Sequence, residues 1–151
     1  MEETKNIYVA MAAILKEVGP VGKEGTNASQ HYSFRGIEQV CAKLSPLFAK
    51  HGMFVVPEVL EQQREIVDRY KDGVVVGKMY TTIARIKYTF YGPDGSSVSA
   101  VTIGEGSDFS DKASNKAMSA AMKYALVQTF CISDSQDEGD KDTPTPTDDF
   151  M

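Results

Sequence analysis

The amino-acid sequence predicts one α+β domain, an antiparallel β-β-β-α core with an additional N-terminal helix and a second amphipathic helix packed on the sheet. Two patterns predict this class. Alternating apolar and polar residues indicate strands in the middle of the chain, and apolar residues at helical spacing indicate helices on both sides of them. A chain of 151 residues with 42% hydrophobic content can bury one such core. Successive strands joined by short turns form one sheet, and the helices back it.

Two helices are predicted ahead of the strands. The first spans residues 4–18, where apolar residues recur every three or four positions and a Gly-Pro pair follows. The second spans residues 37–51; Ser45-Pro46 falls inside it, so the helix either kinks or restarts there. Between the helices, residues 19–31 read as a polar loop, and the alternation in residues 32–36 indicates a short strand.

Three strands follow the second helix. Residues 53–61 form the first, where Pro57 favours a sheet edge or a bulge. The charged segment 62–73 is expected to be mobile. The longest strand spans residues 78–91, with the side chains of alternate residues on a core face, and a Gly-Pro-Asp-Gly turn then leads into a third strand at 96–104.

The helix that closes the domain carries the most informative pattern. Lys112, Lys116, Ser119 and Lys123 follow i, i+4, i+7, i+11 spacing and therefore share one stripe. Alanine and other apolar residues occupy much of the remaining circumference, which predicts a mostly buried helix with one narrow cationic edge. A Gly-containing elbow introduces the helix, and its acids complement the positive end of the helix dipole: Glu105, Asp108 and Asp111.

The net charge of −5 is unevenly distributed along the chain. Residues 134–151 contain seven acids and one lysine, so residues 1–133 carry a net +1. We therefore expect a near-neutral domain over 1–133 and an acidic, disordered tail over 134–151, which is too polar to bury a core. A near-neutral domain still binds a polyanion if its bases cluster.

The sequence argues against several classes of protein. No run approaches the roughly 20 apolar residues of a membrane span, and the start has no secretory signal pattern, so a cytoplasmic protein is expected. The two cysteines lack the spacing of a metal site. Residues 73–79 fail the phosphate-loop pattern, and residues 104–109 place two carboxylates where a pyrophosphate would bind. We expect no cofactor, no metal and no catalytic residue.

What remains is a set of basic residues, some with aromatic neighbours, which suits a single-stranded nucleic acid held by phosphate contacts and base stacking. The candidates are Lys23, Tyr32, Phe34, Arg35, Arg85, Lys87, Lys112, Lys116 and Lys123. A lysine stripe is more often only the solvated face of a helix. The residues alone therefore leave two alternatives open: an oligomeric interaction module that binds no DNA, and a nucleotide-processing enzyme that uses the acidic elbow.

Three segments resemble the ERF (essential recombination function) family of phage single-strand annealing proteins. They are YSFRGIEQV at 32–40, LFAKHGMFVVPEV at 47–59 and GEGSDFSDKASNKAMSAAMKYALVQTF at 104–130. The resemblance implies a recombination protein of the bacterial host cytoplasm that is not an enzyme. It would bind single-stranded DNA and anneal complementary strands without ATP, as a ring or filament of identical subunits.

The resemblance also assigns roles to individual residues. It implies that Lys123 faces the DNA groove and that Lys23 lies in a loop that supplies a further base. Relatives place another basic residue after the KYAL segment, where this chain has Val127 and Gln128. The resemblance therefore implies weaker contacts with phosphate, or contacts shared with Arg85 and Lys87. A phage exonuclease or a host single-strand binding protein would be the protein partner.

Overall fold

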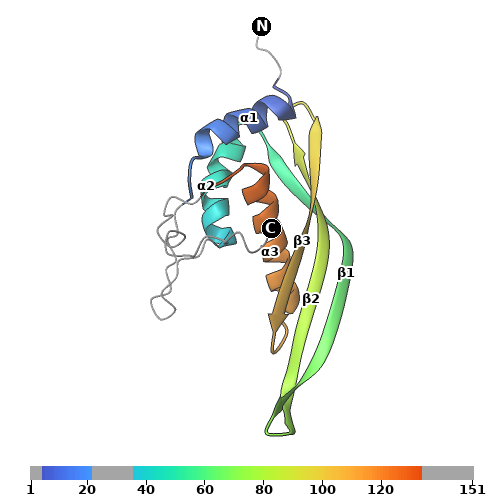
Figure 1. Cartoon of the computed structure of the whole chain (residues 1–151). Helices are drawn as coiled ribbons and strands as arrows, with labels where there is room; N and C mark the ends of the chain where they lie inside the picture. The colour runs from blue at the N-terminus through green and yellow to red at the C-terminus, as the bar shows by residue number, and fades with distance from the viewer. Residues whose placement is uncertain (1–4, 22–35, 134–151) are drawn as a thin grey trace, which may run out of the picture.

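The computed structural model describes residues 5–21 and 36–133, which form a three-stranded antiparallel sheet with helices on one side (Figure 1). The elements in chain order are α1 (Ile7–Val18), α2 (Ile37–Lys50), β1 (Phe54–Lys71), β2 (Val74–Tyr91), β3 (Ser97–Asp108) and α3 (Ala113–Thr129). The strands lie in the order β1-β2-β3, so β1 and β3 are the two edges. The predicted α+β class and the order of two helices, three strands and a last helix are confirmed. The short strand predicted at 32–36 lies, apart from Gly36, outside the described residues.

The core lies between the sheet and the helices. Alternate residues of β2 are buried as predicted, with at most 2% of their surface exposed: Thr82, Ala84, Ile86, Tyr88 and Phe90. Helix α3 packs directly on β2 and β3, and apolar side chains of α1 and α2, such as Ile14 and Leu44, complete the core. Phe48, Phe90 and Phe130 pack together there, with ring centroids 5.6 to 6.4 Å apart.

The prediction for the charged segment 62–73 was wrong, because most of it belongs to β1. This strand has 18 residues and pairs with β2 as far as Lys71↔Val74. Backbone pairing outweighs composition here, since the charged side chains extend into solvent on both faces of the strand. Asp72 and Gly73 both have positive φ, 53° and 79°, as a two-residue hairpin turn requires.

The predicted Gly-containing elbow is instead the end of β3, which continues to Asp108. Gly104 and Gly106 of this strand lie directly beneath α3. A Cβ atom on Gly106 would stand 2.5 Å from the Cβ of Lys116 and 2.6 Å from the carbonyl oxygen of Ala113. The two glycines therefore let the helix backbone rest on the strand backbone.

Two predictions about the helices need correction or refinement. Helix α2 runs continuously through Pro46 and does not restart there. Helix α3 buries a stripe of four alanines at i, i+4 spacing, together with Leu126. Met118 and Tyr124 remain 48% and 43% exposed, so the prediction of a mostly buried α3 was wrong. Within the described ranges, no helix is long and apolar enough to cross a membrane.

Candidate nucleic-acid interface

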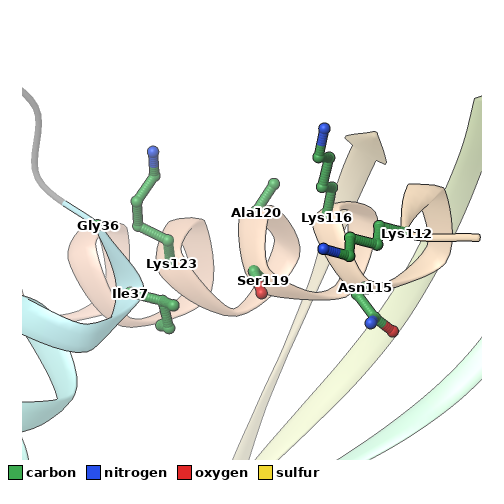
Figure 2. A pocket seen from close by; sticks show the side chains of 8 residues that line it. All are labelled: Gly36, Ile37, Lys112, Asn115, Lys116, Ser119, Ala120 and Lys123. Atoms are coloured by element: carbon green, nitrogen blue, oxygen red, sulfur yellow. The ribbon is translucent and has the colours of Figure 1, made fainter. Parts of the chain in front are cut away.

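The lysine stripe (Lys112, Lys116, Ser119 and Lys123) lines one side of a groove of about 470 Å³ between α3 and the start of α2. Figure 2 shows Lys116 and Lys123 extending to the same side of α3. Gly36 and Ile37, at the start of α2, lie beside Lys123. Lys123 lies eleven positions after Lys112, so the stripe extends about 16 Å along the helix. Lys112 itself is the residue before the first turn, because α3 begins at Ala113.

Lys116 is held by β3. Its ammonium donates to Asp108 Oδ1 at 2.9 Å and to the carbonyl oxygen of Ser107 at 3.1 Å. The hydrogen bond from Lys116, with further ones from Ser110, places the pKa of the Asp108 carboxyl well below its usual range. Lys116 must leave this carboxylate before it contacts a phosphate.

Lys112 and Lys123 differ from Lys116 in this respect. In the described part of the chain, neither ammonium has a carboxylate within ion-pair distance. The Lys123 ammonium lies over the Tyr124 ring, 5.3 Å from the ring centroid. The two ends of the stripe are therefore the charges that an anionic ligand meets first.

Of the acids before α3, Asp108 has a structural role. Asp108 accepts hydrogen bonds from the Ser110 and Lys112 backbone N–H groups at 3.0 and 3.4 Å, close to the helix start. This fits the predicted complement to the helix dipole. Glu105, in contrast, lies within β3 and is exposed. Among the described residues, no three histidine, cysteine or acidic side chains gather as a metal site would need.

Arg85 and Lys87 lie on the opposite side of the sheet from α3. They alternate along β2 with the buried residues Ala84, Ile86 and Tyr88, which face the helices. Arg85 Nε also lies 3.4 Å from Glu61 Oε2. The two bases and the lysine stripe therefore do not converge on one groove within a single chain.

Four predicted site residues lie outside the described residues: Lys23, Tyr32, Phe34 and Arg35. They stay predictions of the sequence. Gly36, the next residue along the chain, is described and lines the groove.

A comparison with models of protein families shows to which family the chain belongs. The model of the ERF superfamily matches residues 7–148, a range that includes all six described elements. The chain belongs to the ERF superfamily. This confirms the resemblance drawn from the sequence and supports a phage-type recombination or annealing protein. A search of curated proteins returned no match.

In this ERF-family chain, sequence reasoning missed part of the groove. Asn115 lies three residues after Lys112, so helical periodicity alone could have placed it beside the stripe. Ile37 comes from α2, 75 positions before Lys112, and no local pattern indicates that contact. The sequence also gave no sign that Lys116 pairs with Asp108, because the two residues belong to different elements.

Proposed function

We propose that this protein binds single-stranded DNA along the lysine stripe and promotes annealing of complementary strands, without ATP, as a homo-oligomer in DNA recombination. The observation that carries the proposal is that Lys112 and Lys123, at the two ends of one groove, have no ion-pair partner among the described residues. Such a groove offers successive phosphates a row of cations. Membership of the ERF superfamily supports the same function.

The structure also suggests the order in which the lysines act. Lys112 and Lys123 give the first phosphate contacts at little cost, because they give up no ion pair with a residue that the structure describes. Lys116 contributes less than either, because each contact with DNA releases Asp108. Arg85 and Lys87 lie on the other side of the sheet. They would contact DNA only if a second stretch of the strand, or a strand held by a neighbouring subunit, reaches that side.

The test is binding of a fluorescent oligonucleotide of about 50 nucleotides by the full chain, with EDTA present and ATP absent. The logarithm of the association constant should fall linearly with the logarithm of salt concentration, with a slope of about 0.7 per phosphate contacted. Replacing Lys112→Ala together with Lys123→Ala should lower the slope by up to about 1.4. The matched control is Lys16→Ala with Lys43→Ala, which removes two exposed lysines of α1 and α2.

Annealing is followed with complementary strands that carry a donor and an acceptor dye. The wild type should accelerate pairing without ATP, the stripe variant should not, and the control should match the wild type. Equal loss in both double variants would mean that only net charge matters. If the wild type binds no single strand, the chain is instead an interaction module that does not bind DNA.

The acidic residues 134–151 suggest a further element of the same function. We propose that they compete with DNA for the lysine stripe, or serve as the attachment point for a phage exonuclease or host single-strand binding protein. Their net charge of −6 is opposite to that of the stripe. Deleting residues 134–151 should tighten DNA binding at 50 mM salt and change it less at 200 mM, where screening is stronger. Unchanged binding at both concentrations would leave only a partner role or a solubilising role.

A further inference from the structure

The sheet extends past the start of α3 on the side that the helix covers. Ser114, in the first turn of α3, lies over β2, because its hydroxyl is 3.1 Å from that of the buried Thr82. Tyr80 is two residues farther along β2, so its side chain points to the same side, beyond the end of the helix. Figure 1 shows β1 and β2 continuing past this end of α3. Ile66, which pairs with Tyr80, is 53% exposed, so this part of the face is open to solvent.

Arg64 and Tyr80 form a cation–π pair on this open face. Arg64 pairs with Thr82 across β1 and β2, and its side chain therefore also points to the helix side. Arg64 Cζ lies over the Tyr80 ring, 5.0 Å from the ring centroid. Arg64 is exposed, whereas Tyr80 is half-buried. The ring therefore holds the guanidinium in position and leaves its outer side accessible to a ligand.

The charge of this guanidinium is available to a ligand. Within the described ranges, Arg64 has no carboxylate within ion-pair distance. Asp68 and Asp108, which point to the same side of the sheet, each have a lysine partner already, at 3.6 and 2.9 Å. Asp111, in the turn before α3, is exposed and has no ion pair with a described residue. Near that carboxylate, an uncharged nucleobase fits better than a phosphate.

The pair is close to one end of the lysine stripe. Asp108 connects the two features, because it pairs with Tyr80 across β2 and β3 and accepts a hydrogen bond from the Lys112 backbone N–H at 3.4 Å. Lys112 is the first lysine of the stripe, and α3 begins directly after it. A strand that follows the stripe toward the start of α3 therefore passes over the end of the helix and reaches Arg64 and Tyr80.

An unpaired nucleobase matches the chemistry of this pair. Each base has two flat π faces, and guanidinium planes and aromatic rings both stack on such faces. Phosphates alone require only cations, which the lysine stripe already supplies. The bases of a duplex are stacked and paired with each other, so only a single strand brings a base to this pair without first breaking a base pair.

We propose that Arg64 and Tyr80 form a stacking platform for one unpaired base of the strand that occupies the lysine stripe. This inference rests on the proposed function and adds a base contact to its phosphate contacts. The base packs on the exposed side of the Arg64 guanidinium, and Tyr80 is a positioning residue that holds the guanidinium. The platform makes the site prefer single strands to duplexes, whereas lysines alone attract both.

The experiment measures binding of three fluorescent ligands of equal length to the full chain: a thymidine strand, an abasic strand and a duplex. Arg64→Lys keeps the charge and removes the planar group. Its affinity for the thymidine strand should fall about tenfold, which is within the range for loss of one stacked base. Its affinity for the abasic strand and the duplex should stay at the wild-type value.

Tyr80 is tested by two substitutions. Tyr80→Leu should show the same selective loss, because the guanidinium is no longer held, and Tyr80→Phe should bind like the wild type. Arg85→Lys is the control for the arginine, since Arg85 lies on the opposite side of the sheet. Tyr8→Leu is the control for the tyrosine, since Tyr8 belongs to α1 and is 68% exposed. Circular dichroism verifies folding, and the exposed Arg64 keeps the test valid if Tyr80→Leu does not fold.

Unchanged affinity of Arg64→Lys for the thymidine strand would overturn the platform. Equal losses for all three ligands would also overturn it, because the pair would then act without contacting a base. The proposed function is tested separately by the wild type. If the wild type binds the thymidine strand through Lys112 and Lys123 and the Arg64 variant binds equally well, the function stands and the platform fails. If the wild type binds no strand, both fail.

Discussion

Substituting Gly106 tests the packing that positions the lysine stripe. In Gly106→Ala, the new Cβ atom would meet the Ala113 carbonyl oxygen and the Ala117 nitrogen at 2.6 Å each, and both belong to the helix backbone. Carbon contacts are comfortable at about 3.5–4.0 Å, so α3 must move away from β3 by roughly one ångström. Overpacking of this kind costs about 1–3 kcal/mol.

A partial offset comes from the unfolded state, which loses about 0.4–1 kcal/mol of conformational freedom when glycine becomes alanine. We therefore expect a net loss of about 1.3 kcal/mol in the free energy of unfolding, or roughly 5 °C in Tm. Gly104→Ala should cost more, because its Cβ would overlap the Ala117 carbonyl oxygen.

Urea unfolding followed by circular dichroism, at one protein concentration, measures this loss. Glu105→Ala is the control, since Glu105 lies between the two glycines and is exposed; it should stay within about 0.5 kcal/mol of the wild type. If Gly106→Ala also stays within that range, α3 does not rest on the backbone of β3, and the placement of the stripe derived from it is wrong.

Three further predictions concern charges and protons. The pKa of Asp108 is below its usual value in the fold, so its contribution to stability is present above about pH 4 and is lost as the pH falls. Asp108→Asn should therefore flatten the acid limb of a plot of urea midpoint against pH. The limb will not vanish, because Glu17 and Asp94 also have lowered pKa values. Burial raises the pKa of Tyr88 to about 12, so stability is full below about pH 10 and declines as the pH rises through 12; Tyr88→Phe should remove that decline, and an unchanged alkaline limb would contradict it. Lys116→Ala should weaken binding of the fluorescent oligonucleotide less than Lys123→Ala, because Lys116 already has a carboxylate partner; equal losses would show that Asp108 does not compete.

Strong local periodicity explains which parts of the fold could be predicted. The buried face of β2 follows from strict alternation, and the lysine stripe follows from helical spacing. The hairpin turn at Asp72-Gly73 also had a sequence signal, since Asp-Gly is a favoured two-residue turn. The charged residues around it outweighed that signal and led to the prediction of a mobile segment.

The remaining features of the site depend on contacts between distant elements. Asp108 reaches Lys116 only because Gly104 and Gly106 bring α3 onto β3. The position of α3 also decides that the stripe and Arg85 face opposite sides of the molecule. A single sequence contains these residues but not the distances between them.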